Sequence, residues 1–208
     1  PERRVVGAVF ATPGDIAAGV SATSLAPAPR MLFTKLRELA PAVKRIHVIY
    51  GADDNDWLIQ LARADAEKLG YELVPQRKES IREGASAYRE LLKQVGSPQD
   101  AIWLLQASPF LDENSVLQMV LRAAWDRNLV VFSSNPSHVP KGALFALFPD
   151  NNAMGRHLAQ QLRKPASPSA RLLPLEQLDT AINIRTADHL GLGLSAGDSR
   201  FDMVFPNR

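Results

Sequence analysis

The chain has 208 residues, of which 46% are hydrophobic, which is enough for one large domain or two small ones with a buried core. Its 24 basic and 22 acidic residues nearly cancel and are scattered along the sequence, so the composition does not indicate a nucleic-acid-binding protein. The sequence contains no cysteine, which excludes disulfides, cysteine nucleophiles and thiolate metal sites. No apolar run approaches the ~18 residues of a membrane span, and no signal peptide is visible.

The N-terminal quarter of the chain begins with a strand and a long loop and then enters an α/β pattern. The apolar run from Val5 to Phe10 predicts a strand, and residues 11–24 form the loop that follows it. Apolar residues at helical spacing predict a helix over 29–39, which Pro41 ends. The β-branched run from Ile46 to Tyr50 then predicts a strand buried on both faces.

The rest of the chain continues this alternation of strands and helices, which is typical of a parallel sheet flanked by helices. A helix is expected over about 56–69, with Gly70 at its C-terminal end. Ser80 and Glu83 form a capping box that begins another helix. In chain order, the later elements expected are a strand at 71–75, a helix at 81–95, a strand at 101–105, a helix with Val116, Met119, Val120 and Ala123 on one face, a strand at 129–133, an extended segment at 142–148, a helix at 151–163, a Pro/Ser-rich connector at 165–175, and a last strand and short helix within 181–192.

In a sheet of this kind, ligands bind beyond the carboxyl ends of the strands, where helix N-termini and free backbone amides converge. Small and polar residues follow several of the expected strands. Each of them alone is also explained as a turn or cap residue, so only their convergence would indicate a site. The loops concerned are 11–23, 51–56, 106–112, 133–138 and 149–152.

The known catalytic signatures are absent from the sequence. It contains no nucleophile elbow, P-loop, dinucleotide fingerprint or zinc-protease motif, and its four histidines lack metal-ligand spacing. Asp53, Asp54 and Asp56 are the best candidates for chemistry, because carboxylates at the end of a strand can hold Mg²⁺. Solvated carboxylates at a helix start explain the same cluster more simply. We therefore expect a protein that is not an enzyme and that has no metal ion or cofactor.

An ordered series of segments resembles the ABC transporter substrate-binding proteins of the tryptophan/tyrosine type. The segment APRMLFTKLRELAPAVKRIHVIY resembles that family's helix, turn and strand after the first crossing between lobes, and AINIRTADHLGL resembles its near-signature VINLKTAKKMGV. The matching segments are 19–24, 28–50, 69–75, 125–147, 148–162 and 181–192.

The resemblance implies an α/β fold of the type I periplasmic-binding-protein class, in which two Rossmann-like lobes joined by a hinge close over a ligand. Family members carry a complete first lobe, whereas this chain has a single strand and loop before the crossing. We therefore expect residues 1–23 to be a remnant of the first lobe and crossing segment, 24–148 to be the second-lobe Rossmann-like domain, and 149–208 to be a return helix, connector and C-terminal strand, helix and tail.

The resemblance also suggests ligand-binding positions, with one departure from the family. Where the family has acidic residues at two strand ends, this chain has Gln106 to Ser108 and Asn135, and the loss of those carboxylates disfavours an aromatic amino acid as the ligand. The positions that match the family in type or place are Ser21, Tyr50, Ser108, Asn135 and Asp150, with Phe110 either a stacking wall or a core residue.

The function implied is that of the periplasmic solute-binding component of an ABC-type importer. It would bind a small polar or aromatic molecule between its lobes without catalysis, dock on a membrane permease and be secreted through a signal that this chain does not contain. A second copy of the chain is a further candidate partner, because a truncated lobe would expose apolar edges. Two alternatives stay open: a sensory or protein-interaction domain that keeps the fold, and a phosphoryl-transfer enzyme that uses the cluster at Asp53.

Overall fold

The computed structural model describes residues 4–9, 11–17, 20–106, 108–163 and 171–206. Its strands are β1 (Arg4–Val9), β2 (Val20–Pro27), β3 (Arg45–Gly51), β4 (Glu72–Lys78), β5 (Asp100–Leu104), β6 (Val130–Ser133), β7 (Phe145–Pro149), β8 (Arg171–Leu175), β9 (Leu178–Asn183) and β10 (Met203–Phe205). Its helices are α1 (Pro29–Leu39), α2 (Ala52–Leu69), α3 (Ile81–Gln94), α4 (Val116–Asp126), α5 (Asn151–Gln161) and α6 (Ile184–His189), with 3₁₀ turns η1 (Pro13–Asp15) and η2 (Pro136–His138).

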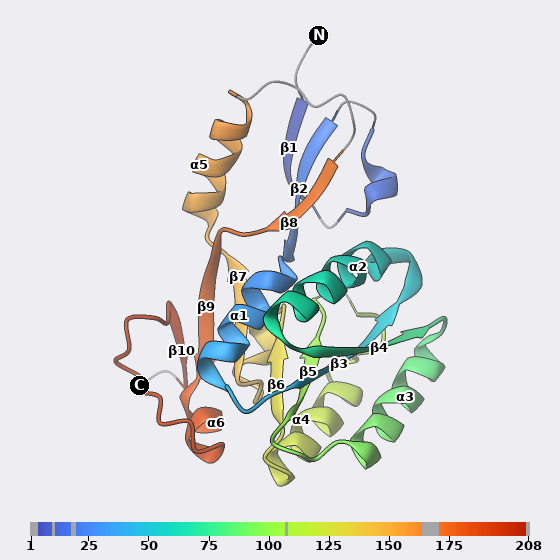
Figure 1. Ribbon diagram of the computed structural model, residues 1–208, viewed down its shortest axis with the longest axis vertical. Helices are drawn as coiled ribbons and strands as arrows, with labels where there is room; N and C mark the ends of the chain where they lie inside the picture. Colours follow the sequence, from blue (N-terminus) through green and yellow to red (C-terminus); the bar gives the residue numbers. More distant parts are fainter. Residues whose placement is uncertain (1–3, 10, 18–19, 107, 164–170, 207–208) are drawn as a thin grey trace.

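The described strands form two sheets of unequal size (Figure 1). The large sheet has seven strands in the order β10-β9-β7-β6-β5-β3-β4, and the small sheet has the order β1-β2-β8. All pairings in both sheets are parallel except that of β7 with β9. The expected class, a mostly parallel α/β sheet flanked by helices, is therefore confirmed.

Both faces of the large sheet are covered by helices, which explains the continuous apolar strands in the sequence. Alternate residues of β3 point to opposite faces, so Val48 packs with α1 and α2 while Ile49 packs with α3 and α4. In β5, Trp103 likewise packs with α1 and α2, and Ile102 packs with α3 and α4. The two hydrophobic clusters hold the carboxyl ends of these strands in fixed positions.

An aromatic group fills the cluster on the α1 side. The ring of Phe33 meets Trp103 edge-on at a centroid distance of 5.4 Å, and Trp103 lies parallel to Phe132 at 6.4 Å. Phe132 in turn stacks with Phe145 at 5.3 Å. These contacts join α1 to β5, β6 and β7, the centre of the large sheet.

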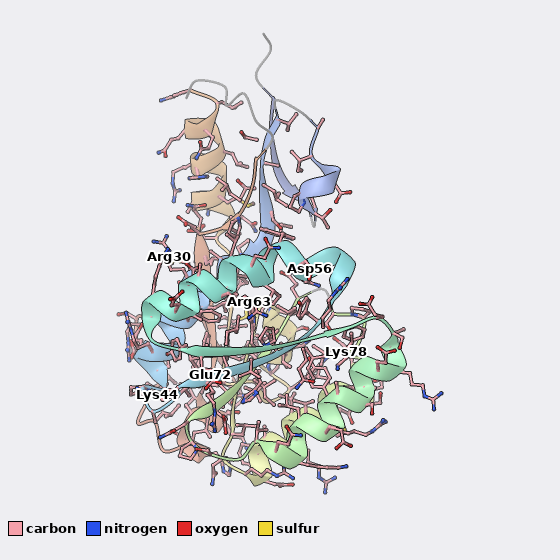
Figure 2. The ribbon with its side chains drawn as sticks, turned by 45° about the vertical axis from the view of Figure 1, so that its right-hand side comes forward. Arg30, Lys44, Asp56, Arg63, Glu72 and Lys78 are labelled. Atoms are coloured by element: carbon pink, nitrogen blue, oxygen red, sulfur yellow. The ribbon has the colours of Figure 1, made fainter. Side chains whose placement is uncertain are left out.

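The strand β4 forms one edge of the large sheet and is charged at both ends. Figure 2 shows Glu72 and Lys78 at the two ends of this strand, with α2 crossing nearby. Pro75 lies in the middle of the strand, where it has no N–H to offer to a further strand. Charges and proline on an edge oppose pairing with another chain.

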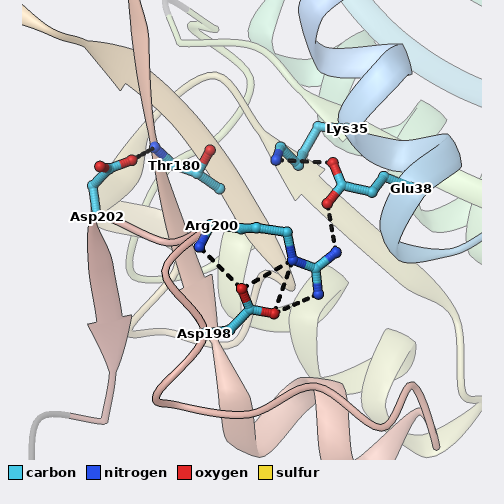
Figure 3. Close-up of polar contacts among 6 residues, drawn as sticks. All are labelled: Lys35, Glu38, Thr180, Asp198, Arg200 and Asp202. Carbon is cyan, nitrogen blue, oxygen red and sulfur yellow. Dashed lines mark hydrogen bonds and ion pairs between the residues drawn. The ribbon is translucent and has the colours of Figure 1, made fainter.

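The C-terminal segment is tied back to α1 by ion pairs (Figure 3). The guanidinium of Arg200 donates to both carboxylate oxygens of Asp198, and its Nη1 lies 2.6 Å from Oε1 of Glu38 on α1. The backbone N–H of Thr180 donates to Asp202 at 2.8 Å, next to the pairing of β10 with β9. This segment therefore belongs to the large sheet.

Three chain segments connect the small sheet and α5 to the large sheet: β2 into α1, β7 into α5, and β8 into β9 (Figure 1). Backbone hydrogen bonds pair these segments, because the Ala28 N–H donates to the Leu175 carbonyl at 2.8 Å and the Asp150 N–H donates to the Gln177 carbonyl at 3.0 Å. The expected domain limits at residues 23 and 148 fall within β2 and β7, beside these connections. The division into three parts stays a prediction.

The main helices and buried strands lie where the sequence predicts them, with four differences. Residues 171–175 of the expected connector form β8, and residues 20–24 at the end of the expected loop belong to β2. The strand β10 was not predicted, and α2 starts at Ala52, before the predicted start near residue 56. The expected end at Gly70 is confirmed, with a positive φ of 76° that glycine adopts without strain. Phe10 and the N-terminal part of the connector, 165–170, lie outside the described residues.

Candidate functional site

A cavity of about 200 Å³ lies at the carboxyl ends of β3, β5 and β6, between the loop that follows β1 and the large sheet. Four of the five loops selected from the sequence contribute to it, as expected if polar residues converge at these strand ends. The lining residues are Ala11, Thr12, Asp15, Ser24, Ala26, Asn55, Trp57, Leu58, Gln106 and Ser134.

The wall on the side of the small sheet is the turn η1, which is fixed by its own hydrogen bonds. The Asp15 carboxylate accepts the Thr12 backbone N–H at 2.7 Å and the Thr12 hydroxyl at 2.9 Å. These two hydrogen bonds, the backbone one first, lower the pKa of Asp15. Asp15 is exposed and is therefore an ionised carboxylate at the rim of the cavity.

The wall on the side of the large sheet is fixed by the buried core. Ser134 follows β6, and its backbone N–H donates to the Leu104 carbonyl at 2.9 Å. Its hydroxyl oxygen accepts the indole N–H of Trp103 at 2.9 Å, which leaves the hydroxyl proton to be donated. The aromatic group in the core thereby sets the position of a polar residue in the cavity.

Ser133 and His138 form a second polar contact just behind this wall. The Ser133 hydroxyl oxygen lies 2.8 Å from Nδ1 of His138 and accepts the Asn135 backbone N–H at 2.9 Å. Burial, followed by the charge of Lys141, lowers the pKa of His138 to about 4, so this imidazole is neutral at neutral pH. The pair holds the loop after β6 in place.

The loop after β5 carries two buried oxygen atoms without a hydrogen-bond partner in the structure, Oε1 of Gln106 and Oγ of Ser108. A buried polar atom that lacks a partner costs about 1–3 kcal/mol. Gln106 is also one of the residues that line the cavity.

The first turns of α2 supply the remaining wall. Gly51 is the N-cap of this helix and makes no side-chain capping bond, and Asn55, Trp57 and Leu58 face the cavity from the helix. Trp57 and Leu58 give the cavity an apolar side opposite its polar residues. An apolar wall with a few polar groups is the usual composition of a small-molecule site.

None of the six residues predicted from the sequence is among the residues that line this cavity. Ser21 lies on β2, paired in register with Val5 and Arg171. Asn135 and Asp150 are N-caps that accept backbone N–H groups, Asn135 from Ser137 and Asp150 from both Asn152 and Ala153. Ser108 lies two positions after Gln106 in the loop that follows β5, and its Oγ is buried without a partner. A ligand-binding role for these residues stays a prediction.

The two aromatic residues of the predicted set are buried. Tyr50 is 7% exposed within the α1-side cluster, where burial and then the nearby Asp56 raise its pKa. Phe110 is 3% exposed within the other cluster, and its ring lies so close to Gly84 that an added Cβ would approach it to 2.2 Å. Of the two alternatives for Phe110, the buried position is that of a core residue and not of a stacking wall.

The structure gives no support to a metal site in the part of the chain that it describes. No group of three or more histidine, aspartate or glutamate side chains there could hold a metal ion. Asp56 faces Arg77, with 3.8 Å between their charged atoms, while the side chains of Asp53 and Asp54 lie outside the description. Of the three aspartates in the magnesium hypothesis, Asp56 alone has a described side chain, and it already faces the cationic side chain of Arg77.

A larger and more open groove of about 750 Å³ runs along α4 to α6. It is lined by acidic and basic side chains together, including the ion pair of Glu113 with Lys141 at 2.7 Å. We favour the smaller cavity as the ligand site, because it lies at the carboxyl ends of parallel strands and is lined from both sides of the connections between the sheets.

Solved structures identify the class of fold. A conserved domain protein from Vibrio cholerae is 22% identical with a TM-score of 0.63, and the match covers 89% of this chain and 62% of that one. An ABC domain from Streptococcus pneumoniae in complex with L-Trp is 20% identical with a TM-score of 0.64, covering 89% and 63%. A substrate-binding protein with adhesive properties from Clostridium difficile, in its ligand-free, open structure, is 17% identical with a TM-score of 0.62, covering 91% and 63%. The fold is that of a type I periplasmic binding protein.

The sequence also matches the family described as ABC transporter substrate binding protein over residues 6–191, and the chain belongs to that family. It spans less than two thirds of the length of each of the three solved proteins. No curated protein matches the sequence. None of the helices that the structure describes is both long and apolar enough to cross a membrane.

Proposed function

We propose that this chain is the ligand-recognition part of a periplasmic solute-binding protein of an ABC importer, and that a small molecule binds in the 200 Å³ cavity. The observation that carries the proposal is the composition of that cavity. Its lining comes from the turn η1 on one side and from the strand ends of the large sheet on the other. This is the position in which a two-lobed protein encloses a ligand by closing.

Further support comes from membership of the family described as ABC transporter substrate binding protein and from the relative solved in complex with L-Trp. In the proposed mechanism, the hydrogen-bonded connections at Ala28–Leu175 and Asp150–Gln177 act as the hinge. The closed form would then dock on a membrane permease on the outer side of the membrane.

Binding without catalysis is the simplest reading of the polar groups near the cavity. Ser133 and His138 have the contact expected of a nucleophile and its base, but they are 0% and 4% exposed. A substrate cannot reach a hydroxyl that is buried in this way. The cavity lining itself, in the residues described, contains no histidine or cysteine.

Native mass spectrometry of the purified chain and a thermal-shift screen of metabolites test this proposal. A retained molecule or a saturable rise in Tm is expected, and Ala11→Trp should abolish it by filling the cavity. Ala17→Trp, on the same loop but outside the lining, is the matched control. A molecule that binds all three proteins equally well would refute the cavity as the site, and a chain that binds no small molecule but captures a protein partner would favour an interaction domain.

A further inference from the structure

The cavity has an electrostatic bias toward one class of ligand. Asp15 contributes a carboxylate, and none of the described lining residues is lysine, arginine or histidine. The hydrogen bonds from Thr12 keep that carboxylate ionised. An anionic ligand would therefore meet a negative charge and no balancing cation, whereas a cationic ligand would be attracted.

The hydrogen-bonding groups of the lining also favour a cationic ligand. Oε1 of Gln106 is buried without a partner and accepts hydrogen bonds only, and Asp15 likewise only accepts. A protonated amine carries three N–H donors and no acceptor, so it would suit the Asp15 carboxylate directly and Oε1 of Gln106 once that amide turns toward the cavity. A ligand carboxylate could accept a hydrogen bond from the Ser134 hydroxyl, but it would meet no cationic side chain among the described lining residues and would be repelled by Asp15.

The apolar wall fits the rest of such a molecule. The indole of Trp57 lines the cavity from α2, and an indole attracts cations to its face and stacks with aromatic rings. The cavity volume of about 200 Å³ is at the small end for ligand sites and favours a compact ligand.

From these features we infer that the cavity binds a compact primary amine with an aromatic or apolar body and without a carboxylate, held between Asp15, Gln106 and Trp57. The inference rests on the proposed function, and it specifies the ligand chemistry that the proposed function leaves open. It differs from what the L-Trp-bound relative would suggest, because an amino acid carries the carboxylate that this cavity disfavours.

Matched pairs of ligands test the inference by isothermal titration calorimetry at low salt. The pairs are tyramine with tyrosine, phenethylamine with phenylalanine, and tryptamine with tryptophan, and each pair differs only by a carboxylate. At least one amine should bind ten or more times more tightly than its amino acid. Its affinity should fall with rising salt, because Asp15 is exposed and its charge is screened.

Variants assign the effect to the cavity. Asp15→Asn should weaken binding of that amine about three- to tenfold, and Trp57→Leu should weaken it by a similar factor. Asp188→Asn, an exposed charge change on α6 far from the cavity, should leave the affinity unchanged. Circular dichroism of each variant confirms that the fold is retained.

The outcomes separate this inference from the proposed function. If amino acids bind as well as or better than all three amines, and Ala11→Trp abolishes their binding, the cavity is a ligand site but the inference is wrong. Amine binding that Asp15→Asn leaves unchanged would also overturn it. If no small molecule binds in a cavity-dependent way, the proposed function itself fails.

Discussion

Mild acid should destabilise this protein through the buried side chain of His138. The imidazole is 4% exposed, and it lies behind the cavity in contact with Ser133. Its pKa in the folded chain is about 4, compared with 6.5 for an ordinary histidine. Between these two values, the unfolded chain binds a proton that the folded chain does not.

The free energy of unfolding therefore rises with pH in this window. The contribution of His138 is complete above pH 6.5 and is lost progressively as the pH falls from 6.5 toward about 4. Each pKa unit corresponds to about 1.4 kcal/mol, so the loss is at most about 3.5 kcal/mol. This is a large share of the 5–15 kcal/mol that is typical of a folded domain.

Urea unfolding at several pH values between 7 and 4.5, followed by circular dichroism, measures the effect. His138→Asn keeps an acceptor near the Ser133 hydroxyl and cannot titrate, so its stability should fall less steeply with acid than that of the parent chain. The matched control is His157→Asn on α5. Because the side chain of His157 is only partly buried, this variant should keep the parent pH dependence. The comparison uses the slope with pH, so a constant loss of stability in a variant does not affect it. If His138→Asn and the parent chain lose the same free energy over this range, the reasoning about His138 is wrong.

Three further predictions concern packing and ion pairs. Asp100→Asn should cost about 1–3 kcal/mol in urea unfolding at pH 7, because the buried carboxylate accepts two hydrogen bonds from Arg45, at 2.7 and 3.2 Å. Burial raises the pKa of Asp100, but the hydrogen bonds and charges of Arg45 and His47 together outweigh it and lower the pKa below its ordinary value of 3.8. The contribution of this residue should therefore be present at neutral pH and be lost as the pH falls below about 4. Gly84→Ala should cost about 1–3 kcal/mol, because the new Cβ would approach the Phe110 ring to 2.2 Å, and a loss within error would contradict that contact. Gly155→Ala, in open space on α5, should instead leave the free energy of unfolding unchanged or raise it by up to about 1 kcal/mol.

The elements that the sequence predicts well are those specified by local periodicity. The helix at 29–39 has the predicted bounds, because its apolar residues recur at helical spacing and Pro41 follows it. The strand after it was also predicted, since β-branched residues fill both of its faces. In contrast, β8 contains Pro174 and follows a Pro/Ser-rich stretch, so its local sequence indicates a connector. It becomes a strand by pairing with β2, a segment about 150 residues earlier, and such a long-range contact leaves no local periodicity.

The candidate site was predicted at the level of loops and missed at the level of side chains. Four of the five loops meet at the cavity because the carboxyl ends of parallel strands share one edge. Which side chain faces the cavity depends on finer geometry. Trp57 lies within the expected helix, but the sequence does not show which face of that helix meets the cavity, and Asp15 lines it because a short turn forms in what had been assigned as loop. The signal that would have found Asp15 is the Thr12-Pro13 pair with Asp15 after it, a cap sequence for a short helical turn.

The two walls of the cavity differ in what holds them, and this difference bears on how a ligand would be enclosed. Ser134 accepts the indole N–H of Trp103, which is itself packed between Phe33 and Phe132, so the wall on the large sheet is as rigid as the core. Asp15 depends only on hydrogen bonds within its own turn and is exposed. A closing motion about the connecting segments should therefore carry Asp15 toward a stationary surface. The rigid wall would then determine which ligand shapes fit. The Asp15 carboxylate would contact the ligand only after closure, so it would discriminate between ligands by their charge.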